Sequence, residues 1–123
     1  MKFIAINTLG EMELRETDGL KGYQNAVGGL IEHVNMARLP SPYSMLVNEE
    51  GRLHHQAMNL CGCYLYATDM HGEPIVGDIV ITKDGMTEDG LDFVGMEEQE
   101  ALRIGNMLQA NTDGTFHWKD PEI

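Results

Sequence analysis

One central segment, residues 47–66, holds both cysteines of the chain together with two histidines, two glutamates and an arginine. Thiolates and imidazoles bind zinc, and a thiol beside a histidine can act as a nucleophile. Structural zinc sites usually pair cysteines at wider spacing than the C-x-C of Cys61 and Cys63. On a helix these thiols point to different sides, and on a strand they share a face with Leu65. Because free cysteine is among the most buried residue types, we expect core rather than a metal site.

Motifs for catalysis or phosphate binding do not occur elsewhere in the sequence. It has no G-x-S-x-G nucleophile elbow. The glycines of "VGGLIE" precede a predicted strand, whereas a phosphate-binding loop must lead into a helix. The acidic stretch "DGMTEDGLDF" lacks the register of an EF-hand loop. We therefore expect no catalytic residues, no metal and no cofactor, and a protein that is not an enzyme. A Cys-dependent hydrolase or a metalloenzyme is the least favoured alternative.

Several polar and aromatic side chains could instead recognise a small ligand. Arginine pairs with phosphate, asparagine hydrogen-bonds to a base or ribose, and tyrosine rings stack on bases. Each type also has a structural alternative: a turn charge for the arginine, a cap for the asparagines and a core aromatic for the tyrosines. A pyrophosphate could also be held by backbone amides near Gly28 and Gly29 or near Gly95. The candidate ligand-binding residues are Tyr43, Asn48, Arg52, Asn59 and Tyr64, with Tyr66 as a further stacking residue.

The charge of the chain is strongly negative and unevenly distributed. The formal net charge is −12, and residues 69–123 hold thirteen acids against three Lys or Arg. Residues 1–68 hold seven acids against five Lys or Arg. Such a chain repels nucleic acids and anionic membranes, so we expect neither as a direct partner. Its charged partners are expected to be cations or a basic protein, and the alternative is a solvated acidic surface without a partner.

Length and composition predict one domain that covers residues 1–123, with residues 112–123 as a tail. Hydrophobic residues make up 42% of the 123 residues, enough for a core. We see neither an apolar run that could span a bilayer nor a signal-peptide pattern. Two cysteines one residue apart are poorly placed for a disulfide and fit the cytoplasm. The small size favours a homo-oligomer.

Hydrophobic periodicity and turn residues predict an α+β fold. We expect a small mixed or mainly antiparallel sheet of about five strands, packed with two or three helices. The nearly all β-branched segment "IVGDIVIT" is expected to be central in the sheet. The main strands are predicted at residues 2–7, 12–17, 30–36, 43–47 and 75–82, shorter ones at 91–95 and 115–118, and helices at 20–27 and 96–110.

Particular residues are expected to set helix ends and turns. Asp18 is expected to cap the first helix, and Gly28 with Gly29 to end it. Gly95 is expected to cap the last helix, and Gly51 to take the left-handed position of the "NEEG" turn. The acidic stretch "KDGMTEDG" is expected to be a loop. The side chains expected to face inward are Leu20, Tyr23 and Val27 on the first helix, and Ala101, Ile104 and Leu108 on the last.

Residues 60–67 fit two structures. Asn59 suits a helix N-cap, and Leu60, Cys63, Tyr64 and Ala67 have helical spacing. The same segment also alternates, through Cys61, Cys63, Leu65 and Ala67, as a strand would. The position between two predicted strands favours the helix.

Three pieces occur in a fixed order: "VGGLIEHV", "LVNEEGRLHHQAMNL" and "IVGDIVIT". Their order resembles a domain-of-unknown-function family that is widespread in bacteriophages, plasmids and other mobile elements. The resemblance covers residues 20–100 and rests on residues 27–32, residues 47–53, Asn59 and Gly77. It implies a small cytoplasmic α+β protein of phage type and carries over no catalytic residue.

Two functions follow as hypotheses. The first is a non-enzymatic phage-type accessory protein that binds and sequesters a small ligand, for example a nucleotide-derived signal of host defence. Such a protein would work in the cytoplasm of the host cell. The alternative is an acidic protein–protein inhibitor, or a mimic of nucleic acid, that acts on a basic host protein.

Overall fold

The N-terminal residues form a tight hairpin whose turn is built by an asparagine. In the computed structural model, which describes residues 1–119, β1 (Lys2–Ile6) pairs antiparallel with β2 (Glu11–Glu16). The Oδ1 atom of Asn7 accepts hydrogen bonds from the backbone amides of Leu9 and Glu11, each at 3.0 Å. Such asparagine turns replace the backbone bonds that the reversal loses. The hairpin confirms both strands predicted in this region.

The strands join into one seven-stranded sheet in the order β3-β4-β5-β1-β2-β7, with β6 also paired to β5. Neighbours are antiparallel except β2 and β7, which are parallel. The α+β class and the mainly antiparallel sheet are confirmed, with more strands than the five expected. The remaining strands are β3 (Ile31–Val34), β4 (Tyr43–Asn48), β5 (Ile79–Thr87), β6 (Gly90–Phe93) and β7 (His117–Trp118).

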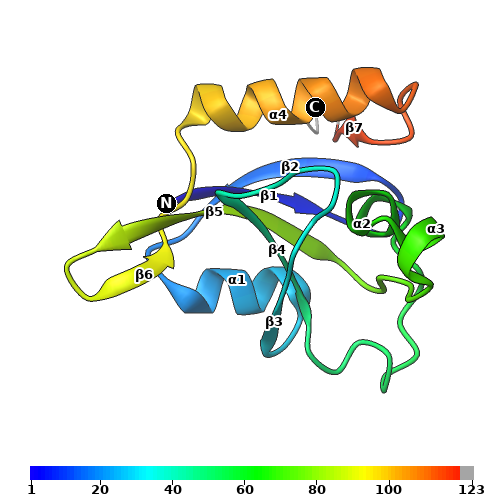
Figure 1. The fold of residues 1–123 in the computed structure, drawn as a ribbon, viewed down its shortest axis with the longest axis horizontal. Coiled ribbons are helices and arrows are strands. Elements are labelled where there is room, and N and C mark those ends of the chain that lie inside the picture. Colours follow the sequence, from blue (N-terminus) through cyan, green and yellow to red (C-terminus); the bar gives the residue numbers. More distant parts are fainter. Residues whose placement is uncertain (120–123) are drawn as a thin grey trace.

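Helices cover both faces of this sheet (Figure 1). The helix α4 lies along one face and α1 along the other, while α2 and α3 lie at one end. Residues 1–119 contain four helices, one or two more than expected. They are α1 (Leu20–Val27), α2 (Leu60–Tyr66), α3 (Thr68–His71) and α4 (Glu98–Asn111). Within the described part of the chain, none of them combines the length and the apolar character that a membrane span needs.

The alternation of side chains along the strands divides the core into two layers. Met45 and Val47 of β4 face the layer that α2 and α4 cover, whereas Leu46 faces α1. Successive strand residues point to opposite faces, so an apolar run such as "MLV" fills both layers. This arrangement explains why β1 is apolar from Phe3 to Ile6 and β5 is apolar from Ile79 to Ile81.

The strand β5 differs most from its prediction. It begins at Ile79 instead of residue 75, because Gly77 takes a positive φ of 77° that interrupts the extended chain. It then continues to Thr87, so the expected acidic loop is a hairpin with β6. Gly85 permits this hairpin, because a Cβ atom there would lie 2.8 Å from the side chain of Val94. The predicted central position of the strand is confirmed.

The first helix spans the predicted residues, but its N-cap lies one residue later than expected. Gly19 is the N-cap of α1, and no side chain caps it, so the expected role of Asp18 is wrong. Tyr23 and Val27 are buried as predicted, but Leu20 is exposed because it lies in the first turn, beyond the edge of the core. Gly28 ends the helix in the left-handed conformation, as expected.

The ambiguous segment after Asn59 is a helix. The Oδ1 atom of Asn59 accepts a hydrogen bond from the amide of Gly62 at 3.0 Å, which confirms the predicted N-cap. Cys61 and Leu65 face the core, while Leu60 is exposed. The N-cap at Asn59 therefore indicated the structure of this segment correctly, whereas the strand-like alternation of its side chains did not.

The last helix starts with a capping box. The carboxylates of Glu97 and Glu100 each bond to the other residue's backbone amide, so Glu97 is the N-cap and the prediction of Gly95 is wrong. Ala101, Ile104 and Leu108 face the core as predicted. The strand β7 then pairs with β2, and the amide of Lys119 donates to the carbonyl oxygen of Met12, so the expected tail is attached to the sheet as far as Lys119. The rest of that tail, residues 120–123, lies outside the described residues.

The turn after β4 also differs in detail. Gly51 does not take the left-handed conformation, which His55 adopts instead with a φ of 53°. Gly51 is nevertheless constrained, because a Cβ atom there would lie 3.0 Å from Gln56 and 3.1 Å from Val76. Close packing rather than backbone conformation therefore explains this glycine.

Candidate functional site

A groove of ≈ 450 Å³ lies between the strands β3 and β4 and the segment that leads into β5. The residues at its base are apolar and include Val47 and Ile75, both buried. Antiparallel pairing places Glu32 of β3 opposite Val47 of β4, so side chains from both strands reach the same face of the sheet. The groove is therefore formed by the outer edge of the sheet. Its polar walls are formed by Glu32, Asn35, Glu49, Arg52, Tyr66 and Glu73.

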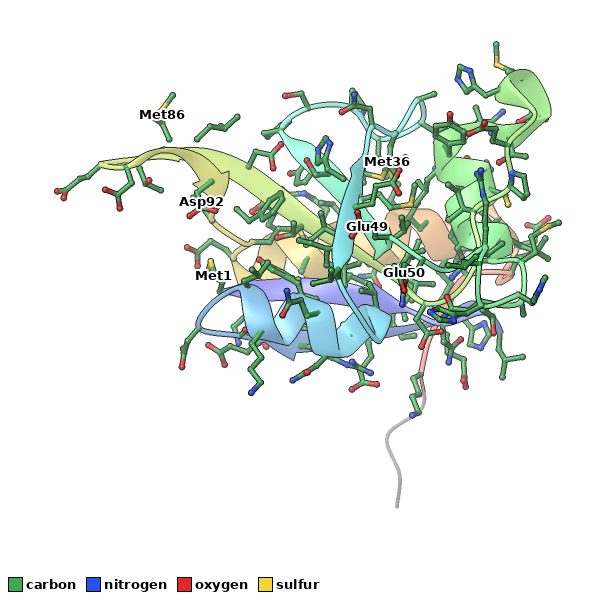
Figure 2. The ribbon with its side chains drawn as sticks, turned by 90° about the horizontal axis from the view of Figure 1, so that it is seen from below. Met1, Met36, Glu49, Glu50, Met86 and Asp92 are labelled. Carbon is green, nitrogen blue, oxygen red and sulfur yellow. The ribbon has the colours of Figure 1, made fainter. Side chains whose placement is uncertain are left out.

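The end of β4 and the turn that follows it bring two predicted binding residues, Asn48 and Arg52, to this groove. Asn48 is buried, and its amide donates to the carbonyl oxygen of Val27 at 3.1 Å. Its Oδ1 atom accepts from the amide of Glu50 at 2.8 Å, so the side chain connects α1 to the turn. Figure 2 shows Glu49 and Glu50 where this turn leaves the strand. Asn48 therefore supports the groove wall, with its side-chain atoms already engaged.

Arg52 bridges the groove from one wall to the other. Its guanidinium donates to the carbonyl oxygen of Pro74 at 3.0 Å and lies 3.5 Å from the carboxylate of Glu73. About half of the side chain remains exposed, and a guanidinium has five N–H donors. Arg52 can therefore still donate to a ligand while it holds the two walls together.

The other three predicted residues lie outside the groove. The hydroxyl of Tyr43 donates to Glu100 of α4 at 2.6 Å. The ring of Tyr64 packs edge-on against Phe116 at 5.5 Å, and Arg38 lies 4.8 Å from its centroid. Asn59 is completely buried at the start of α2. The fold thus brings Asn48, Arg52 and Tyr66 together and keeps Tyr43, Asn59 and Tyr64 apart from them.

The amides of Gly28 and Gly29, one of the two places proposed for a pyrophosphate, are already bonded. The backbone N–H groups of Gly28 and Gly29 both donate to the carbonyl oxygen of Gln24, at 2.8 and 3.0 Å. They close the last turn of α1 as a helix C-terminus normally does. These two glycines therefore act as a helix stop.

Three groove carboxylates were not predicted from the sequence: Glu32, Glu49 and Glu73. They lie on β3, on the turn after β4 and before β5, so only the pairing of the sheet brings them together. Side chains alternate along β3, so the sequence could have indicated that Glu32 and Val34 share one face of this strand. It could not have indicated which residues form the facing wall of the groove. Arg52 is the one Lys or Arg residue that lines the groove, whereas three glutamates line it. The walls of the groove are therefore net negative.

A polar chain crosses the other face of the same strands. The Nε2 atom of His33 lies 2.8 Å from Oγ of Ser44, and Ser44 donates to Asp84 at 2.6 Å. The serine proton thus faces the carboxylate, and the imidazole must be the donor to the serine oxygen. A catalytic triad needs the reverse order, with histidine between serine and acid. Ser44 is also only 1% exposed, so this chain joins three strands and does not form a nucleophile.

The two cysteines differ in environment. Cys61 is buried, and its burial raises the pKa of the thiol to about 12. The sulfur of Cys63 accepts a hydrogen bond from the amide of Ile75 at 3.3 Å. Both are free thiols. Among residues 1–119, no three His, Cys, Asp or Glu side chains gather in a way that could hold a metal ion.

The family model for a domain of unknown function (DUF3846) matches residues 1–109. The chain belongs to this family. The match covers the sheet from β1 to β6, with α1 to α3 and most of α4, and confirms the resemblance to a domain of unknown function. The DUF3846 description gives neither an activity nor a source, so the expected phage or plasmid origin stays a prediction. No curated protein and no solved structure matches the chain.

Proposed function

We propose that this DUF3846 protein is a non-enzymatic accessory protein that binds and sequesters a small ligand in the β3–β4 groove. The observation that supports this function is the groove itself. Its volume of ≈ 450 Å³ falls in the range of about 300–1,000 Å³ that small-molecule sites occupy. Its base offers apolar contacts, and its walls offer carboxylates, a guanidinium, an amide and the phenol of Tyr66.

The carboxylates favour a ligand that carries a cationic amine or guanidinium group. Glu32, Glu49 and Glu73 outnumber the single arginine of the walls, and that arginine already faces Glu73. Hydrogen bonds between a cation and a carboxylate are about twice as strong as neutral ones. The ring of Tyr66 adds a surface on which a cation or a flat group can stack.

A nucleotide-derived signal of host defence is the competing ligand class. Arg52 is the groove residue that would bind one phosphate of such a ligand. A ligand with several phosphates would face repulsion from the three carboxylates. A cationic ligand would depend on the groove carboxylates, whereas a nucleotide would depend on Arg52. Substitution of these charged residues therefore distinguishes the two ligand classes.

A thermal-shift screen tests the function. The panel contains diamines and polyamines, arginine and its decarboxylated amine, nucleotides, cyclic dinucleotides and ADP-ribose. A ligand at about a hundred times its dissociation constant adds about 2.7 kcal/mol to the free energy of unfolding. For a domain of this size the melting midpoint then rises by about 3–8 °C. We expect a rise with a cationic compound.

Charge variants locate the site. Glu49→Gln combined with Glu32→Gln is expected to abolish the shift with a cation, while Glu98→Gln, an exposed position on α4, preserves it. Arg52→Gln is expected to abolish a shift with a nucleotide. A panel without any shift, or a shift that both groove variants leave unchanged, contradicts the proposal. The expected homo-oligomer stays a prediction, which light scattering on the purified protein checks.

A further inference from the structure

The hairpin of β5 and β6 extends beyond the layers that the helices cover (Figure 1). Residues 84–87 of β5 pair with β6, whereas residues 80 and 81 of the same strand pair with β1 and β4 together. The strand β6 has β5 as its one neighbour among residues 1–119. Its outer edge therefore presents backbone groups that a further strand could pair with.

Two large apolar side chains on this hairpin are mostly exposed to solvent. Met86 is 78% exposed and Leu91 is 73% exposed, and antiparallel pairing places them directly opposite each other. Figure 2 shows Met86 pointing away from the rest of the molecule. A cross-strand apolar pair normally packs on a core or on a partner. In this structure it contacts neither helix layer, so it is available to another molecule.

The charged side chains of this part of the sequence are all acidic. Residues 84–102 hold seven carboxylates and no Lys or Arg. Among residues 1–119, no Lys, Arg or His forms an ion pair with Glu88, Asp89 or Asp92 of the hairpin. The charge excludes an anionic membrane or a nucleic acid as the occupant. It also disfavours a second copy of the chain, since two such hairpins would repel each other.

A hollow of ≈ 560 Å³ borders the same strand on the side of α1. Leu20, Phe93 and Val94 provide its apolar surface, and Asp18 and Asp92 provide its carboxylates. Met1 also lies there, with its ammonium group bonded to the carbonyl oxygen of Thr17 at 2.9 Å. The combination suits a long basic side chain, whose methylene stem covers apolar surface while its charged end meets a carboxylate.

We infer that the β5–β6 hairpin is a docking surface for a basic protein. An extended segment of that protein adds to the open edge of β6 as a further strand. Its apolar residues cover Met86 and Leu91, and one of its Lys or Arg side chains enters the hollow toward Asp18 and Asp92. This surface is separate from the β3–β4 groove, so the inference does not depend on a ligand in the groove.

The test uses a defined probe, a labelled peptide of alternating Lys and Val residues, with fluorescence anisotropy as the readout. We expect binding by the full-length protein that weakens as salt screens the charges, measured from about 50 mM to 500 mM. A peptide of alternating Glu and Val, with the same apolar content, is expected not to bind. Amide NMR shifts on addition of the Lys–Val peptide should be confined to the hairpin and the start of α1.

Matched variants separate the hairpin from general charge effects. Met86→Ser with Leu91→Ser is expected to weaken binding at least about tenfold, the effect of losing one well-covered apolar side chain. Leu9→Ser with Met70→Ser removes side chains that are 75% and 76% exposed elsewhere and should leave the affinity unchanged. Asp92→Asn should weaken binding, whereas Asp78→Asn, with the same change of charge, should not.

Several outcomes overturn the inference. The first is absence of binding at millimolar peptide. A second is an equal loss of peptide affinity in the two apolar double variants or in the two aspartate variants. A third is a set of NMR shifts centred on the β3–β4 groove. All replaced side chains are exposed, so the variants are expected to fold, which their melting curves verify.

Discussion

The side-chain amide of Asn59 lies 2.8 Å from the carbonyl oxygen of Gly77 and also donates to the carbonyl oxygens of Ile6 and Asn7, at 3.1 and 3.3 Å. Its oxygen at the same time caps α2 through Gly62. One completely buried side chain thus connects the end of β1, the start of α2 and the approach to β5.

Replacement of Asn59 is therefore expected to be severe. Asn59→Ala removes a helix cap and leaves buried carbonyl groups without a donor, so the free energy of unfolding should fall by about 2–4 kcal/mol. Asn59→Asp should be at least as damaging, because it keeps the cap oxygen but turns a carboxylate toward the carbonyls. Urea denaturation measures both. Asn25→Ala, at an exposed position of α1, is the control, and equal loss there would refute the assigned role.

The burial of Cys61 predicts a thiol that reacts slowly and weakens the fold at high pH. Its pKa is raised to about 12 from an ordinary value of 9.0, so the unfolded chain loses the proton first. The resulting stability is fully present below pH 9 and is lost as the pH rises toward 12. In Cys63→Ser, alkylation of the native protein at pH 8 should be about a hundredfold slower than in urea. Mass spectrometry checks this, and equal rates would contradict the buried environment.

The bond between Tyr43 and Glu100 predicts a loss of stability in acid. Burial tends to raise the pKa of Glu100, but hydrogen bonds from Tyr43 and Lys83 outweigh it and hold that pKa below its ordinary value. The contribution to stability is therefore present above the unfolded pKa, near 4.5, and is lost as the pH falls through the folded pKa.

Two variants test this linkage. Glu100→Gln should flatten the acid side of the curve of stability against pH. Tyr43→Phe should lower the free energy of unfolding at pH 7 by about 0.5–1.5 kcal/mol. Tyr66→Phe removes the same hydroxyl from the groove and is the control. An unchanged acid slope in Glu100→Gln would show that other groups carry the pH dependence.

The contact between Gly105 and Trp118 predicts an optical signal for the attachment of β7. A Cβ atom at Gly105 would overlap the indole ring, which also donates to Asn106 at 2.8 Å. Gly105→Ala favours the helix itself, by about 1 kcal/mol, but should displace the single tryptophan into water. We expect a red shift of the fluorescence. Gly19→Ala, where a Cβ atom meets open space, should leave the spectrum unchanged.

The sequence predicted local structure well where one side chain decides it. Asn59 identified the start of a helix that alternation alone left ambiguous, and Gly28 identified the end of another. Prediction from the sequence failed where residues distant in the chain determine the local structure. Lys83 and Asp84 are typical of a loop, yet they lie in β5 because β4 and β6 pair with them. Glu32 and Glu73 share a groove only through the fold, since 41 positions separate them in the chain.

The two ends of β5 differ in how many strands they pair with, and they should therefore differ in how easily they open. Val80 and Ile81 pair with neighbours on both sides, whereas residues 85–87 pair with β6 alone. Amide hydrogens at the first two positions should therefore exchange with solvent only when the whole domain unfolds. Those near the hairpin end should exchange through local opening at much lower free energy. A single continuous strand thus begins in the most protected part of the molecule and ends in a part that can open while the core stays folded.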